Sequence, residues 1–241
     1  MEGRGSAGSG KKLEYTTIKV RLDPTPEQAA LFEKTFGCCR YLWNQMLADQ
    51  ERFYLETDTH FIPTPAKYKN EAPFLREVDN QALIQEHNRL AQAFRTFFKS
   101  PETFGHPRFK RKKDGRDSFT ACNHVFDSGP TIYLTKNGIR MTKAGVVRAR
   151  FHRRPRNGWK LRRITVERTS TGRYECCILY AYEVPETPPV RPVPERTVGL
   201  KYSLAHFYAA DTGELADPPR WLEQSQEKLA GLQRRLSRMQ P

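Results

Sequence analysis

A series of short strand-like segments separated by turn residues, between residues 105 and 184, constrains the fold of this chain more than any other feature. The turns are marked by Gly138, Gly145, Asn157-Gly158 and Thr171-Gly172. Between and around these turns, strands are expected at residues 119–122, 131–134, 139–141, 146–151, 161–167 and 173–184. Several short strands at this spacing are typical of a small barrel or sandwich.

One further strand is predicted far upstream, at residues 13–22, where apolar and polar residues alternate. Two helices with apolar residues at helical spacing follow it. The first is expected at about residues 26–55, after the capping-box pattern of residues 25–28, and the second at about residues 79–100. Residues 57–77 contain three prolines and are expected to form a loop-rich link. The helices are therefore an insertion between the first strand and the others, and the predicted fold class is α+β.

The charge of the chain is strongly basic and unevenly distributed. Lysine and arginine outnumber acidic residues 41 to 27, which gives a formal net charge of +14. Residues 136–173 hold 13 of these cations and a single acid, Glu167. A solvated surface is the alternative explanation, but such a segregated excess suits a polyanion, and nucleic acid is the commonest one.

Two groups of cations are the candidate nucleic-acid contacts. The first surrounds Phe109, which offers a ring for stacking on a base or sugar, and consists of Arg108, Lys110, Arg111, Lys112, Lys113 and Arg116. The second belongs to the strand region and consists of Arg148, Arg150, Arg153, Arg154, Arg162 and Arg163. Arginine dominates the second group, which favours bidentate contacts with phosphate over a role in solubility alone.

Several classes of protein are disfavoured by the composition. The chain has no apolar stretch of about 18 residues, so no transmembrane helix and no membrane partner are expected. Residues 1–12 are expected to be a disordered lead and not a signal peptide, which indicates a cytoplasmic protein. The five cysteines show no metal-ligand spacing and are expected to be core thiols, and no metal ligand is assigned.

The last part of the chain begins after a proline-rich linker at residues 185–196. The apolar run at 197–204, a second apolar run and the turn at 211–214 form a pattern of strand, turn, strand and turn, which is typical of the start of an RNase H-like domain. A basic helix is expected at residues 223–239. The first strand of such domains normally presents a carboxylate to a catalytic metal ion, whereas this chain has Lys201. An ammonium group repels Mg²⁺, so the pattern favours binding without cleavage.

Taken together, these segments resemble the TnpB family of transposon-encoded RNA-guided nucleases, which are similar to type V CRISPR effectors. The resemblance is carried by residues 34–41, 75–83, 105–110, 118–120, 197–200, 227–230 and 234–237. It implies a wedge β-barrel formed by residues 13–24 and 104–184, a helical recognition lobe at 25–103 and a partial RuvC-like segment at 197–241.

The resemblance also implies partners and further site residues. The partners are a guide RNA derived from the transposon end and a double-stranded DNA target with a short flanking motif. Residues at the family's motif-reading positions are Asn80, Gln81, Thr120 and Asn123. The family uses Mg²⁺ in its RuvC domain and a structural Zn²⁺ in a later part, and neither cofactor is expected in this chain.

Two departures from the family shape the predicted function. The first catalytic aspartate of the family falls on Lys201, and its other carboxylates and CxxC zinc element are not found before Pro241. We therefore expect a transposon-associated, RNA-guided DNA-binding protein without nuclease activity. The alternatives are the N-terminal portion of an active RNA-guided DNA endonuclease, and a decayed transposon remnant that binds only RNA.

Overall fold

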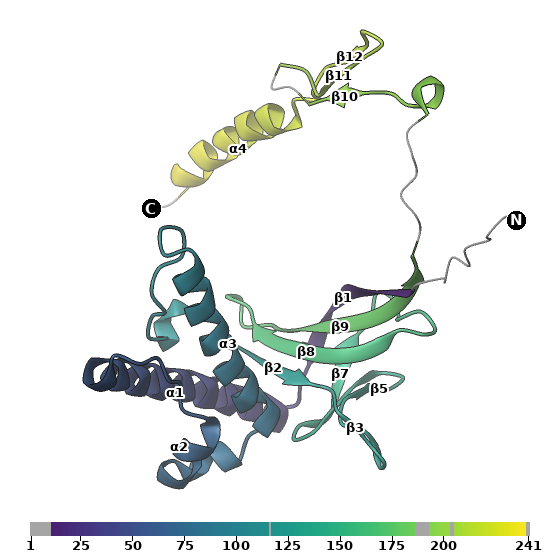
Figure 1. Ribbon diagram of the computed structural model, residues 1–241. Helices are drawn as coiled ribbons and strands as arrows, with labels where there is room; N and C mark the ends of the chain where they lie inside the picture. The colour runs from purple at the N-terminus through teal and green to yellow at the C-terminus, as the bar shows by residue number, and fades with distance from the viewer. Residues whose placement is uncertain (1–10, 116, 187–192, 203–204, 240–241) are drawn as a thin grey trace, which may run out of the picture. The chain divides into compact units, whose positions relative to one another are not determined.

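The computed structural model describes residues 11–115, 117–186, 193–202 and 205–239, which belong to two compact units, Met1–Glu186 and Thr187–Pro241 (Figure 1). Most of the predicted lead, residues 1–10, and the central part of the predicted linker, residues 187–192, lie outside the described residues. No helix in the described ranges is both long enough and apolar enough to cross a membrane.

The first unit contains an antiparallel sheet of seven strands in the order β2-β8-β9-β1-β7-β6-β5. The strands are β1 (Lys11–Asp23), β2 (Ser118–Cys122), β5 (Tyr133–Leu134), β6 (Gly138–Met141), β7 (Gly145–Arg150), β8 (Lys160–Arg168) and β9 (Tyr174–Pro185). The upstream strand β1 lies between β9 and β7, with Ile18 opposite Ile178. The predicted α+β class is confirmed, and Lys11 and Lys12, which the sequence assigned to the lead, belong to β1 and pair with β9.

The two edges of this sheet are linked by a side chain. Within the described residues the strand order ends at β2 and β5, so no strand ladder closes the sheet into the expected barrel. Asn123, directly after β2, accepts hydrogen bonds through Oδ1 from the Ile132 amide at 3.0 Å and the Thr131 hydroxyl at 3.3 Å, just before β5. One side chain therefore bridges the place where a barrel would have its last pair of strands.

One face of the sheet forms a core with the first helix. Ile18, Val20 and Leu22 are at most 2% exposed, as the alternation of residues 13–22 predicts. Phe32 and Phe36 of α1 (Pro26–Thr57) each lie 5.7 Å, between ring centroids, from Phe119 of β2. Helix α1 begins with the predicted capping box of Thr25 and Gln28.

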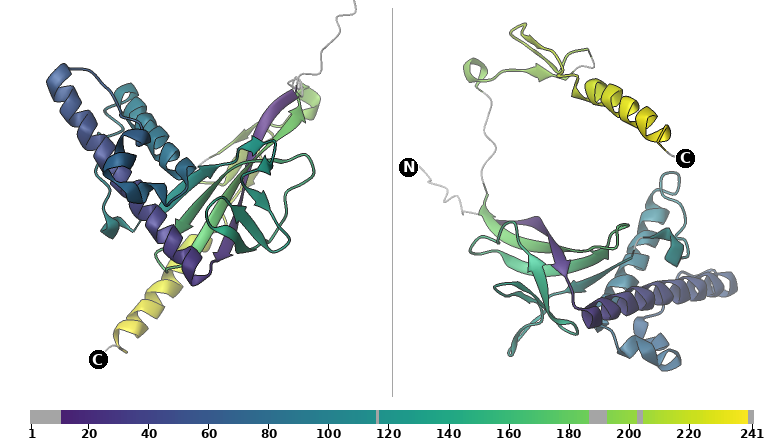
Figure 2. Two further views of the ribbon diagram at one scale, coloured as in Figure 1. Left: turned by 90° about the horizontal axis from the view of Figure 1, so that it is seen from below. Right: turned by 180° about the vertical axis from the view of Figure 1, so that it is seen from behind.

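A second core holds the helices together at one end of the sheet (Figure 2). It joins α1 to α2 (Pro65–Glu71), the short 3₁₀ helix η1 (Pro73–Arg76) and α3 (Asn80–Lys99), which has Asp79 as its N-cap. The predicted loop-rich link therefore contains α2 and η1. The prolines misled the prediction because Pro65 and Pro73 stand in the first turn of these short helices, where the missing amide costs no hydrogen bond.

The strand predictions for residues 105–184 are largely confirmed, with ends that differ by one or two residues. The sequence missed a two-stranded ribbon of β3 (Val125–Phe126) and β4 (Gly129–Pro130), which is too short and too exposed to show a periodic pattern. The segment expected at 131–134 is a strand only at Tyr133–Leu134.

The second unit contains three short antiparallel strands, β10 (Leu200–Lys201), β11 (Tyr208–Ala210) and β12 (Leu215–Ala216), in sequential order. They follow the 3₁₀ helix η3 (Pro194–Arg196) and precede helix α4 (Trp221–Ser237), which starts two residues before the predicted 223–239. Gly213 has a φ of +86° in the turn between β11 and β12, where a side chain would be strained.

Candidate nucleic-acid interface

Strand β7 places two arginines on the exposed face of the sheet. Arg148 and Arg150 are exposed, whereas Val147 and Ala149 between them are 0% and 8% exposed. Arg150 Nε donates to Asp23 Oδ2 at 2.7 Å, and this bond holds the pKa of the Asp23 carboxyl below its usual value. Both arginines line a basic pocket of about 820 Å³, which suits an anionic ligand.

The loop after β7 adds Arg153 and Arg154 to the same pocket. Arg153 Nη2 donates to the Thr17 carbonyl at 3.1 Å, and Arg154 Nη1 donates to the Thr135 carbonyl at 3.0 Å. The Arg154 guanidinium also lies 4.5 Å from the ring centroid of Phe151. These two side chains remain exposed, but they also fasten the loop to the sheet, so their replacement would disturb the local structure as well as the charge.

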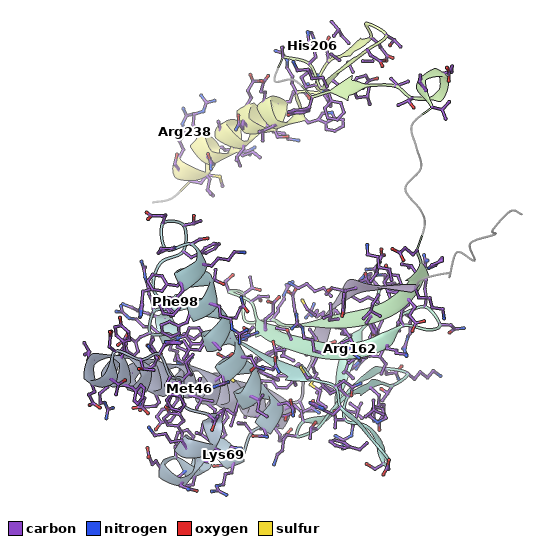
Figure 3. All side chains as sticks on the ribbon, viewed as in Figure 1. Met46, Lys69, Phe98, Arg162, His206 and Arg238 are labelled. Carbon is purple, nitrogen blue, oxygen red and sulfur yellow. The ribbon has the colours of Figure 1, made fainter. Side chains whose placement is uncertain are left out.

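An irregularity in β8 exposes two consecutive arginines. Leu161 pairs with Tyr180 and Arg163 with Leu179, so the register shifts by one residue at Arg162. The side-chain alternation of a regular strand is interrupted there, and both Arg162 and Arg163 are exposed. Neither side chain makes a hydrogen bond or an ion pair within the part of the chain that the structure describes. Figure 3 labels Arg162 on the sheet.

The predicted cluster around Phe109 is held in an extended form against α1. Trp43 Nε1 donates to the Arg108 carbonyl at 2.9 Å, and Asn44 bonds both the amide of Lys110, at 2.8 Å, and its carbonyl, at 3.0 Å. Lys110 Nζ lies 4.0 Å from the Trp43 ring centroid and 2.6 Å from Glu86 Oε2. Lys110 is therefore ion-paired within the protein, and the phosphate contact that the sequence predicts for it would compete with this pair.

A pocket of about 590 Å³ separates this segment from α1, and Arg108, Phe109 and Arg111 line it. Its wall includes Asp117, which is 7% exposed and is bonded by two arginines: Arg40 at 3.0 Å and Arg168 at 2.5 Å. Since both carboxylate oxygens are engaged, Asp117 opposes an anion less than a free aspartate would. Lys112 and Lys113 are exposed in the short 3₁₀ helix η2 (Lys112–Asp114), and Arg116 lies outside the described residues.

The four predicted motif-reading residues differ in how free they are. Asn80 is exposed at the start of α3 and hydrogen-bonds Lys69, and Gln81 is half-buried with no side-chain hydrogen bond among the described residues. Thr120 is 4% exposed and its hydroxyl lies 2.8 Å from the Thr165 hydroxyl. Asn123 bridges the sheet edges and also donates to the Leu161 carbonyl at 3.2 Å. Their reading of DNA stays a prediction, and for Thr120 and Asn123 it would compete with these bonds.

Sequence reasoning missed a buried carboxylate, Glu86, on the face of α3 that packs inward. It is 0% exposed and bonds Arg89 at 2.7 Å as well as Lys110 at 2.6 Å. The spacing of residues could have revealed its burial, because Glu86 falls between Leu83 and Leu90 on the apolar face of the helix. A carboxylate at such a position needs cationic partners.

In the second unit Lys201 is exposed on β10 and pairs with Ala209. The neighbouring carboxylates are engaged in the hairpins: Asp211 Oδ2 accepts from the Gly199 amide at 2.8 Å, and Glu214 accepts from the Tyr208 hydroxyl at 2.8 Å. Among the described residues, no three side chains of His, Cys, Asp or Glu lie together as a metal site would require. The residues described in this unit therefore do not fit a two-metal centre.

Comparisons with known proteins agree with the predicted family. The family described as "Helix-turn-helix domain" (HTH_OrfB_IS605) matches residues 15–58, which here form β1 and α1. A "Putative RNA-guided DNA endonuclease" of Streptomyces pristinaespiralis is 28% identical over 230 residues, which are 92% of this chain and 54% of that protein. The "Putative RNA-guided DNA endonuclease InsQ" of Escherichia coli K12 is 29% identical over 236 residues, 95% of this chain and 54% of that protein.

The chain thus spans about half the length of the curated relatives it matches. A cryo-EM structure of a Cas12f1–sgRNA–target DNA complex is similar with a TM-score of 0.34 and 12% identity, over 94% of this chain and 62% of that one. The resemblance read from the sequence is confirmed by the family match and the two relatives: the chain is similar to putative RNA-guided DNA endonucleases.

Proposed function

We propose that this chain binds a guide RNA from a transposon end and, with it, a double-stranded DNA target that carries a short flanking motif. The observation that carries the proposal is the pair Arg162 and Arg163, two exposed guanidinium groups without an intramolecular partner within the described residues. The relatives' description as RNA-guided DNA endonucleases supports the choice of RNA and DNA as the partners.

The charge distribution supports a backbone-reading role. Arg148, Arg150, Arg162 and Arg163 project from a rigid sheet, whose spacing is set by the strand ladders and not by flexible loops. In RNA-guided recognition the protein contacts the phosphate backbone of the guide and its duplex, while base pairing selects the sequence. Arginines held on the strands of a sheet suit that task because each guanidinium can bond a phosphate through two N–H groups.

We further propose that the chain does not cleave the DNA it binds. Lys201 replaces the carboxylate that the family resemblance places on the first strand, and the nearby Asp211 and Glu214 are engaged in hairpin contacts. Catalysis by two metal ions needs several carboxylates directed at one site. The ammonium group of Lys201 suits contact with a phosphate better than coordination of a cation.

The test is to purify the chain, sequence the RNA that copurifies with it, and measure binding of labelled DNA duplexes that match or do not match that RNA. We expect one structured RNA species and DNA binding that depends on the match. Binding of RNA without any matched DNA binding would favour a remnant that binds only RNA. Mg²⁺-dependent cutting of the matched duplex would favour an active endonuclease and refute the proposal that the chain does not cleave DNA.

A further inference from the structure

We infer that Arg89, on α3, is a specificity-determining residue that reads a guanine in the DNA flanking the target. The inference rests on the proposed function, since it assigns a residue to the reading of the flanking motif. Four features of the structure support it: the fixed orientation of the guanidinium, its remaining donors, the saturation of Thr120, and the polar stripe of α3 to which Arg89 belongs.

The Arg89 guanidinium is held in place from two sides. Its Nη1 donates to Glu86 Oε1 at 2.7 Å, and its Nη2 donates to Thr120 Oγ1 at 2.6 Å. Two bonds from different nitrogens fix both the position and the plane of the group. An arginine that is already ordered loses less conformational entropy when it binds a base edge, so the contact discriminates better.

Arg89 is not needed to balance the charge of Glu86. The second oxygen of this fully buried carboxylate already bonds Lys110 Nζ at 2.6 Å, so one carboxylate holds two cations. The Arg89 side chain keeps 35% of its surface exposed, and the two bonds use two of its five N–H groups. The cluster of Glu86, Arg89 and Lys110 thus carries an excess positive charge and free donors.

Thr120, at one of the family's motif-reading positions, has its hydroxyl engaged within the protein. It is 4% exposed, accepts from Arg89 and shares a hydrogen bond of 2.8 Å with Thr165. A hydroxyl has one donor and two acceptor sites, so little remains for a base. Thr120 therefore orients Arg89, whose half-buried side chain keeps the N–H donors at this place that can bond a ligand.

Arg89 belongs to a polar stripe on α3. Gln81, Gln85 and Arg89 are four residues apart and lie on one side of the helix, and all three are half-buried. The two glutamine amides make no side-chain hydrogen bond among the described residues. Glutamine pairs with adenine and arginine with guanine N7 and O6, and the major groove admits an α-helix. The stripe has the chemistry for reading base edges.

The experiment is a binding-site selection with the full chain and its guide, on targets whose flanking base pairs are randomised. Wild-type protein should prefer guanine at one flanking position by about 5- to 150-fold, the range for a good bidentate contact. Arg89→Ala should abolish that preference, and Arg89→Lys should abolish most of it while it keeps the charge and the pair with Glu86. Arg95→Ala, which removes an exposed cation of the same helix, is the control and should leave the preference unchanged.

Glu86→Gln tests the positioning of Arg89. It should weaken guanine preference while RNA affinity stays within about twofold, whereas a purely structural Glu86 would change the melting temperature and leave the preference intact. If both Arg89 variants keep the wild-type preference for guanine, the inference is overturned and the proposed function is unaffected. Guide-dependent binding without any flanking preference in the wild type overturns the inference together with the motif-reading element of the function. Loss of guide-dependent binding in the wild type refutes the proposed function itself.

Discussion

The double variant Arg162→Ala/Arg163→Ala is the sharpest test of the proposed RNA contact. Neither side chain has an intramolecular hydrogen bond or ion pair within the described residues, so the substitution removes charge without breaking a structural contact. Exposed substitutions of this kind usually change the free energy of unfolding by no more than about 0.5 kcal/mol. The folded population should therefore stay the same.

The size of the effect follows from counterion release. Each phosphate contact on a single strand contributes about 0.7 to the slope of log affinity against log salt, so two contacts contribute about 1.4. If wild type and variant bind equally at about 1 M salt, affinity for the guide RNA should fall about 25-fold at 0.1 M and about 10-fold at 0.2 M. The loss should thus shrink as salt rises.

The assay is a titration of labelled guide RNA at several salt concentrations with wild-type protein and two variants. Arg52→Ala/Lys67→Ala is the matched control, because it removes two exposed cations from the helical lobe, where both pair with Asp49. We expect the control to keep the wild-type slope. Equal slopes for all three proteins would refute the placement of the contact on β8, and equal losses in both variants would indicate a response to net charge alone.

Four further outcomes are expected. Glu86→Ala should lower the free energy of unfolding, measured by urea denaturation, by about 2 to 3 kcal/mol, because it leaves two partly buried cations without their carboxylate. A change below about 1 kcal/mol would contradict a stabilising role for the ion pairs of Glu86 with Arg89 and Lys110. Burial raises the pKa of the Cys39 thiol, so iodoacetamide at pH 8.5 should modify half-buried Cys122 before Cys39. A mass-spectrometric time course measures the two rates, and equal rates would be inconsistent with the described core. Partial desolvation lowers the pKa of the imidazole of His60, which packs against Phe94, so the unfolded chain binds the proton more tightly. The melting temperature should therefore fall as pH drops below about 6.5, and it should fall less in His60→Asn. Identical pH profiles of the two proteins would exclude His60 as the cause. Lys201→Asp should not yield Mg²⁺-dependent cleavage in a plasmid-nicking assay, since a single added carboxylate does not make a two-metal site; nicking by this variant would show that the other ligands are present.

Local sequence patterns determined the elements of the first unit. The alternation of residues 13–22 and the capping box of Thr25 and Gln28 are both confirmed, because strand period and helix capping depend on neighbours within a few residues. The exposed and buried sides of β7 followed in the same way from alternation. Prolines in the link between the helices were read as loop residues, since their role in a first helical turn depends on what packs on those short helices.

Tertiary structure alone decided which polar groups are free to bind a ligand. Lys110 belongs to a run of cations that suits phosphate, but it forms an ion pair with Glu86, 24 residues away. Arg162 and Arg163 would alternate between faces in a regular strand, and only the register shift against β9 exposes both. Asn123 bridges the sheet edges through residues eight and nine positions further along the chain. A sequence pattern shows which side chains can carry charge or donate a bond, whereas long-range packing determines which of them the fold has already paired.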